Sequence, residues 1–177
     1  MMHEIFDTKL EVLDSDITFE KIYEKEYIPV EYMDDIKKAN FLIIPNEEFR
    51  NEKCTLFPET TRQFFEFIKE SSEKNIIPDI AISDEDFQQI ELHSAVVEVA
   101  TVIVQWLVFP VAANLISTFL YDLAKKYHRK PEETSTKVKI ITEETKTKKS
   151  KVITYEGPIS GVKEALSQAS KDFFSGD

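Results

Sequence analysis

The sequence predicts an α+β fold, or a small α/β fold, because its hydrophobic pattern changes twice along the chain. Residues 1–86 alternate strand-sized apolar runs with helical spacings, a pattern typical of a β-α-β-α-β order. Residues 87–128 hold a long apolar stretch, and residues 129–177 return to strand alternation followed by a helix. We therefore expect an acidic head, an apolar helical segment and a ββα tail, the last two packed as one unit.

Three short apolar runs define the head. They cover residues 10–13, 41–44 and 76–82. Pro58 lies where a helix would begin, and Phe64, Phe65 and Ile68 then follow a helical spacing. One or two shorter helices fit between the first two runs. This order favours a small parallel sheet with right-handed crossovers.

Carboxylates follow all three runs, at the strand ends where open parallel sheets bind ligands. As catalytic candidates we take Asp14, Asp16, Glu47 and Asp84. As ligands for Mg²⁺, which prefers oxygen donors, we take Asp14, Asp16, Glu48 and Asp86. The alternative is that these acids cap helices and solvate loops, since 23 acids in the first 94 residues will follow strands by chance. We favour that alternative and expect no cofactor.

The apolar middle, residues 95–121, is the most unusual stretch of the chain. Its hydropathy resembles that of a transmembrane helix, and basic residues follow it from Lys125. Pro110, however, should kink a helix or restart it, and neither half would then span a bilayer comfortably. Two interpretations remain: the stretch forms helices that are buried in the protein, or residues 95–121 insert into a membrane. In either case an interface or membrane contact would use Trp106, Phe109, Leu115 and Phe119.

The tail alternates apolar and polar residues over two stretches joined by the lysine-rich segment 143–149. Val138 with Ile140 and Val152 with Thr154 predict two strands of a hairpin, and Gly157 with Pro158 predicts the turn into a final helix. The lysines could attract nucleic acid, but no aromatic residues are interleaved with them for base stacking. We expect the lysines to be solubilising, and nucleic acid not to be a partner.

Glycine is so scarce that it excludes several classes of protein. The three glycines, Gly157, Gly161 and Gly176, all lie in the last 21 residues. The chain therefore has no phosphate-binding glycine loop, no dinucleotide turn and no nucleophile elbow. The single cysteine, Cys54, excludes an intramolecular disulfide and a cysteine-based zinc site. A cytoplasmic location suits that cysteine content, with inner-membrane association as the alternative.

The charge distribution favours a binding protein over an enzyme. The chain carries a net charge of −11, and the first 94 residues alone carry −13. Acidic small bacterial immunity proteins, antitoxins and defence-system accessory subunits have such a composition. The leading hypothesis is thus a non-enzymatic module that binds a basic protein partner or associates with itself. The alternatives are a membrane-anchored or membrane-active protein, and a small metal-dependent or nucleotide-processing enzyme that uses the head carboxylates.

Overall fold

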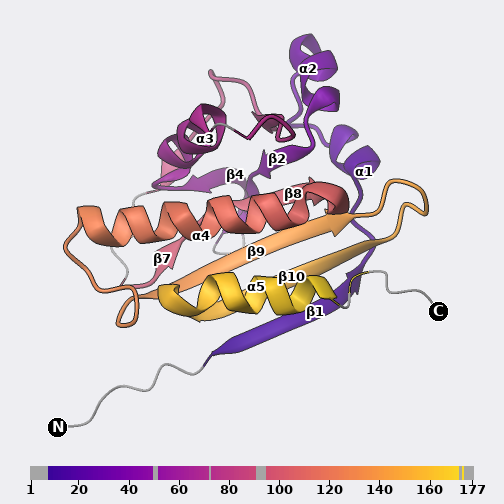
Figure 1. Ribbon diagram of the computed structural model, residues 1–177. Coiled ribbons are helices and arrows are strands. Elements are labelled where there is room, and N and C mark those ends of the chain that lie inside the picture. Colours follow the sequence, from indigo (N-terminus) through magenta and orange to yellow (C-terminus); the bar gives the residue numbers. More distant parts are fainter. Residues whose placement is uncertain (1–7, 50–51, 72, 91–94, 172, 174–177) are drawn as a thin grey trace, which may run out of the picture.

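The computed structural model describes residues 8–49, 52–71, 73–90, 95–171 and 173, which form an α+β fold around a mixed sheet (Figure 1). The strands are β1 (Lys9–Ser15), β2 (Phe41–Ile44), β3 (Asn46–Phe49), β4 (Glu52–Pro58), β5 (Pro78–Ile80), β6 (Gln89–Ile90), β7 (Val97–Glu98), β8 (Thr101–Gln105), β9 (Ser135–Glu143) and β10 (Ser150–Pro158). The helices are α1 (Phe19–Tyr23), α2 (Met33–Lys38), α3 (Thr61–Glu70), α4 (Phe109–Lys126) and α5 (Val162–Lys171). The predicted fold class is therefore confirmed.

One sheet runs through all three segments of the chain. Its strand order is β1-β10-β9-β8-β2-β5, with β7 added beside β9. The head strand β1 pairs along its whole length with the tail strand β10, and β8 from the apolar middle lies between β2 and β9. A second, smaller sheet contains β3, β4 and β6. Head, middle and tail thus share one scaffold.

The directions of the strands differ in part from the predicted parallel sheet. β2 and β5 are parallel and are connected through α3, as expected. β1, however, is antiparallel to β10, and the register through β9 and β8 makes it run opposite to β2. The expectation of three parallel head strands was therefore wrong for β1. The tail hairpin offers β1 a full-length partner, and the pattern of the head alone carries no sign of that pairing.

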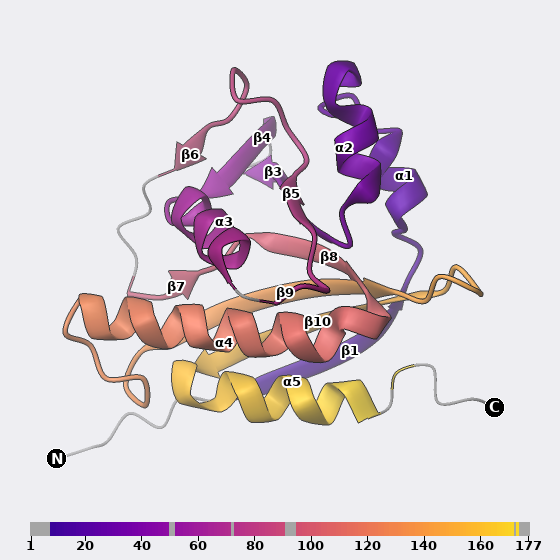
Figure 2. The same cartoon turned by 45° about the horizontal axis from the view of Figure 1, so that its top comes forward.

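Helices cover both faces of the sheet. α4 and α5 lie side by side across one face, with α3 beyond α4, whereas α1 and α2 cover the other face near β2 (Figures 1 and 2). The alternation of buried residues along β2 explains this layering: Phe41 and Ile43 join the α3–α4–α5 core, and Leu42 and Ile44 join the α1–α2 core. Both cores consist largely of fully buried aliphatic and aromatic side chains.

The apolar middle contains one long helix, preceded by strands. Pro110 lies in the first turn of α4, where its missing N–H costs nothing, so a helix begins at this proline and is not kinked by it. The expected first helix, by contrast, is replaced by β7 and β8. The β8 sequence TVIVQ is rich in β-branched residues, and three of its side chains are buried between the two cores. Burial on both faces gave this strand a continuous apolar run, which resembles a buried helix.

Left-handed turns are made without glycine in the described residues. The two positive φ angles belong to His128 (56°) and Lys148 (60°), and Gly157 and Gly161 have negative φ. Gly157 lies inside β10, which continues to Pro158, so the turn predicted at Gly157 is displaced into the short 3-10 helix Ile159–Gly161. The two glycines instead make room for Tyr155, because a β-carbon at either position would approach its buried hydroxyl within 3 Å.

The lysine-rich loop is tied to the head by a buried acid. Glu143 ends β9 with 6% of its surface exposed, and its Oε1 accepts the backbone N–H of Phe19 at 3.0 Å, at the start of α1. Across the loop, Lys148 forms an exposed ion pair with Glu20 at 2.6 Å. The loop lysine is therefore partnered within the fold. Burial raises the pKa of the Glu143 carboxyl above its ordinary value of 4.5, against the lowering effects of the Phe19 N–H and Lys148.

Glu143→Gln is expected to remove a pH-dependent cost. Because the pKa is higher in the folded state, folded Glu143 binds its proton more tightly than the unfolded chain does, so its contribution favours folding at low pH. That contribution is lost as pH rises from about 4.5 through the folded pKa. Glu143→Gln keeps an acceptor for Phe19, so its stability relative to wild type should rise between pH 4 and pH 7.

Urea unfolding across that pH range measures this difference. Glu143→Ala serves as the comparison: it leaves the Phe19 N–H without its acceptor and should lower the free energy of unfolding by about 1 kcal/mol. A stability difference between Glu143→Gln and wild type that stays constant with pH would contradict the assignment.

Candidate functional site

The sheet separates the predicted carboxylate candidates into two groups. Since β1 runs opposite to β2 and β5, the acids after β1 lie at one end of the strands and the acids after β2 and β5 lie at the other. β1 and β5 are also opposite edges of the sheet. These two groups therefore do not converge on one site, and such a convergence was the less favoured of the two interpretations of these carboxylates. A parallel arrangement would have been needed to bring them together.

The acids after β1 are paired with lysines at the surface. Asp14 Oδ1 lies 3.1 Å from Nζ of Lys151 on the neighbouring strand, and Asp16 Oδ2 lies 3.8 Å from Nζ of Lys21. Both carboxylates are more than nine-tenths exposed. Exposed pairs of this kind contribute little to stability and leave the carboxylates solvated. Asp14 and Asp16 are placed as surface residues.

The acids after β2 and β5 lie in turns and in the smaller sheet. Glu47 and Glu48 belong to β3, and their side chains lie outside the described ones. Asp84 and Asp86 are exposed in the loop after β5, where the Asp86 N–H donates to the Ser83 hydroxyl oxygen at 3.2 Å and that hydroxyl donates to Asp86 Oδ2 at 3.1 Å. Within the described residues, three or more metal-ligating side chains do not come together anywhere.

Most of the apolar candidates for an interface lie in the core. Phe109, Leu115 and Phe119 are 1%, 7% and 5% exposed. Phe109 meets Phe173 of the C-terminal segment edge-on at 4.6 Å, and Phe119 lies 5.1 Å from Phe64 and 5.5 Å from Phe67 of α3, ring centre to ring centre. These three side chains are therefore not available to a partner in this fold. Trp106, just before α4, is partly buried.

The α4 helix has two properties that bear on a membrane. The helical stretch Trp106–Lys126 is long and apolar enough to cross a bilayer by length and composition. In this structure most of its apolar side chains face the sheet, α3 and α5, and 56% of its most apolar window is buried. A core helix of this kind passes the same test of length and composition.

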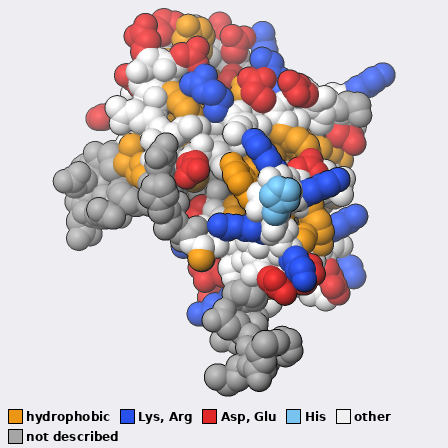
Figure 3. Space-filling model, turned by 90° about the vertical axis from the view of Figure 1, so that its left-hand side faces the viewer, with side chains coloured by type: hydrophobic (Ala, Val, Ile, Leu, Met, Phe, Trp, Pro, Cys, Tyr) orange, Lys and Arg blue, Asp and Glu red, His pale blue; other side chains and the backbone are white. Residues whose placement is uncertain are grey.

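An acidic surface lies over α2 and the strand beside it. It comprises Glu31, Asp34, Asp35, Asp79, Asp84, Glu85 and Asp86. Figure 3 shows acidic side chains gathered at the top of the molecule, which is the α2 end. Within the described part of the chain, none of these carboxylates forms an ion pair. These seven carboxylates outnumber the two lysines of α2, Lys37 and Lys38, so the charge of this surface is negative on balance.

Asp79 shows how closely these acids lie. Burial is the main cause that raises the pKa of its carboxyl, and the negative charges of Asp35 and Asp84 raise it further. The Ile80 N–H, which Asp79 Oδ1 accepts at 2.8 Å, and Lys69 act in the opposite direction. The carboxylate of Asp79 thus experiences the charges of α2 and of the loop after β5 together, so these two segments form one electrostatic surface.

Exposed apolar side chains lie on the segments that carry these acids. Val30 and Tyr32, in the short 3-10 helix that leads into α2, are 84% and 51% exposed, and Ile77, next to β5, is 50% exposed. Large apolar groups inside a charged rim are typical of protein interfaces. The excess of acids in the head was apparent from the sequence. The contact between α2 and β5, which brings these acids together, is a long-range contact that the sequence pattern does not reveal.

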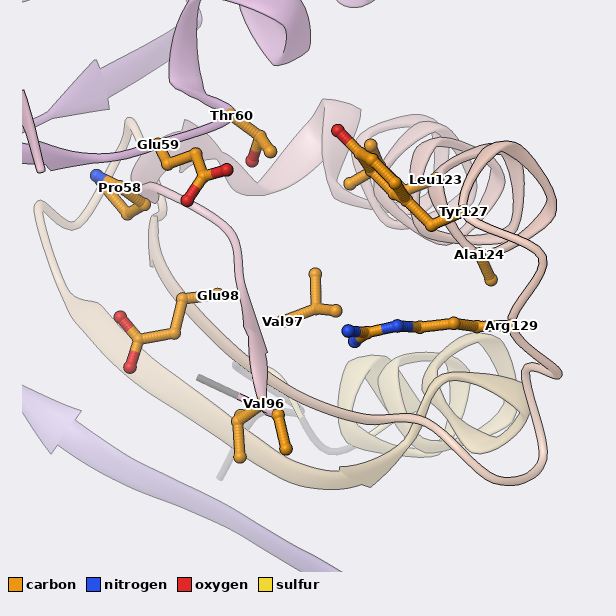
Figure 4. A pocket seen from close by; sticks show the side chains of 11 residues that line it. Pro58, Glu59, Thr60, Val96, Val97, Glu98, Leu123, Ala124, Tyr127 and Arg129 are labelled. Carbon is orange, nitrogen blue, oxygen red and sulfur yellow. The ribbon is translucent and has the colours of Figure 1, made fainter. Parts of the chain in front are cut away.

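A separate pocket of about 450 Å³ lies between the start of α3, β7 and the end of α4 (Figure 4). Its walls are mainly apolar and include Val97, Leu123, Ala124 and Tyr127. The side chain of Arg129 extends into it from beyond the end of α4, toward Val97 (Figure 4). Glu59 and Glu98 also line it, and the carboxylate of Glu98 points away from Arg129 (Figure 4).

The backbone of Arg129 is held in this position by the turn at His128, which has a left-handed backbone conformation. The N–H of Arg129 donates to the carbonyl of Ala124 at 2.7 Å, and the N–H of His128 donates to the carbonyl of Lys125 at 3.1 Å. With His128 at φ 56°, these bonds form a Schellman motif that ends α4. Histidine occupies the place usually taken by glycine, so neither Arg129 nor the pocket was apparent from the sequence.

Comparison with known proteins gives no relative from which a function could be transferred. No family model matches the chain, and neither a curated protein nor a solved structure is significantly similar to it.

Proposed function

We propose that this chain is a non-enzymatic binding protein that recognises a basic protein surface through its acidic surface. The observation that carries the proposal is the set of carboxylates without ion pairs in the described residues, placed together by the contact of α2 with β5. Lysine and arginine side chains of a partner would supply the missing counter-charges.

The apolar residues on the same segments support a protein partner over a small cation. Val30, Tyr32 and Ile77 offer the desolvated contact area on which protein interfaces depend, and tyrosine is enriched at interface centres. A free metal ion would gain nothing from such groups, and the carboxylates do not converge as ligands in the described chain. The partner we infer therefore combines basic residues with at least one apolar side chain.

The test is affinity for short peptides that combine lysine or arginine with leucine and tryptophan. Wild type should bind the best of them with an affinity that falls as salt rises, because the attraction is electrostatic. Asp34→Asn, Asp35→Asn and Asp84→Asn combined should weaken that binding by about tenfold or more.

The matched control removes the same charge elsewhere. Glu132→Gln, Glu133→Gln and Glu164→Gln combined neutralise three exposed carboxylates away from the acidic surface. This control should change the affinity by no more than about twofold, through net charge alone. Equal losses in both triple variants would mean that the attraction comes from net charge and not from this surface.

A further inference from the structure

The pocket beside Arg129 is distinct from the acidic surface and has the opposite charge at its mouth. Two lysines, Lys125 and Lys126, end α4, and Arg129 and Lys130 follow two residues later. All four side chains are exposed. In Figure 3, basic side chains surround His128, shown in pale blue, with apolar side chains between them. An anion approaching this end of the molecule is therefore attracted, although the protein as a whole is acidic.

The interior of the pocket is suited to an apolar group. Val97 of β7 faces Leu123 of α4 and Tyr127, the residue after α4, across the space, and Ala124 adds a small apolar wall (Figure 4). Leu123 and Ala124 are otherwise buried, at 5% and 3% exposed, so they present apolar surface only toward the pocket and the core. A volume of about 450 Å³ lies within the range of small-molecule sites.

The guanidinium group of Arg129 extends into the pocket toward Val97 (Figure 4). Within the described residues it forms no ion pair, so its donors are free for a ligand. A guanidinium binds a carboxylate through two parallel hydrogen bonds, and its geometry distinguishes it from the neighbouring lysines. The Schellman motif holds the backbone of Arg129 in place, which reduces the entropy lost on binding.

We propose that this pocket binds a small amphipathic carboxylate, an apolar chain or ring that ends in a carboxylate. The apolar part lies between Val97, Leu123 and Tyr127, and the carboxylate pairs with Arg129 at the mouth. Glu59 and Glu98 line the side of the pocket opposite Arg129, and the carboxylate of Glu98 points away from it (Figure 4), so the guanidinium of Arg129 is the group placed to pair with a carboxylate.

Calorimetric titration with decanoate, below its micelle concentration, tests the proposal. Wild type should bind one decanoate per chain. Arg129→Gln should raise the dissociation constant by about tenfold or more, since a charge-assisted pair is lost. Lys130→Gln, which removes the same charge from an exposed residue that does not line the pocket, should raise it by no more than about twofold.

Two further measurements separate this site from general attraction. Decanol, which has the chain without the charge, should bind at least about tenfold more weakly than decanoate. Ala95→Phe, at an exposed residue that lines the pocket, should block decanoate while thermal unfolding stays unchanged. Undetectable binding of decanoate by wild type, tighter binding of decylamine than of decanoate, or an equal effect of Arg129→Gln and Lys130→Gln would each overturn the proposal.

Discussion

Phe119→Ala is expected to lower the free energy of unfolding by about 3–5 kcal/mol, the usual cost of removing a buried phenylalanine from a packed core. Phe119 is 5% exposed, and its ring lies against Phe64 and Phe67, which connects α4 to α3. Urea unfolding followed by circular dichroism measures the loss.

The control for this prediction is Leu107→Ala, close to the start of the same helix. Leu107 is 71% exposed, so its truncation should change stability by no more than about 0.5 kcal/mol. A helix that crossed a bilayer would not depend on the contact between Phe119 and α3. Equal effects of the two substitutions would therefore argue against α4 as the core helix of this fold.

Gly161→Ala is expected to cost about 1–3 kcal/mol, because it overpacks a site without free space. A β-carbon at Gly161 would lie 2.6 Å from the hydroxyl oxygen of Tyr155, which donates to the Pro158 carbonyl at 2.6 Å and belongs to a residue that is 0% exposed. Backbone strain plays no part, since the φ of Gly161 is negative. Thermal unfolding of the single variant measures the cost.

A double-mutant cycle with Tyr155→Phe identifies the cause. Without the hydroxyl, the nearest atom of that ring lies 3.6 Å from the new β-carbon, an ordinary contact, so Gly161→Ala should then cost less than about 1 kcal/mol. Gly157→Ala offers a contrast: it would still meet the ring at 3.1 Å and should be rescued only in part. Additive effects of Gly161→Ala and Tyr155→Phe would contradict the steric explanation.

The local patterns of the sequence predicted local structure well. The spacing of Phe64 and Ile68 predicted α3, the period of two predicted β9 and β10, and Pro110 marked the start of α4. Each of these depends on neighbours within a few residues. They were sufficient for the fold class and for the layout of the tail.

What the sequence could not predict depends on pairing over long distances. The direction of β1 follows from its partner β10, more than 130 residues away, and that direction separates Asp14 from Asp84. β8 was mistaken for a helix because a strand buried on both faces has no alternation to reveal it. The chain reaches Arg129 through His128, which has a left-handed backbone conformation that no residue pattern predicted.

The acidic surface was predicted only as a charge excess of the head. Its shape depends on the contact between α2 and β5, and the negative charges of Asp35 and Asp84 both act on the carboxyl of Asp79. The proposed binding function rests on that arrangement more than on the net charge.

The most direct measurement is therefore a map of the contacts made by a basic peptide, obtained from backbone amide shifts in a nuclear magnetic resonance titration. We expect the largest shifts on residues 30–38 and 77–86, and we expect these shifts to shrink as salt is added. Shifts concentrated on β1, β9 and β10, or spread evenly over the exposed carboxylates of the chain, would contradict it.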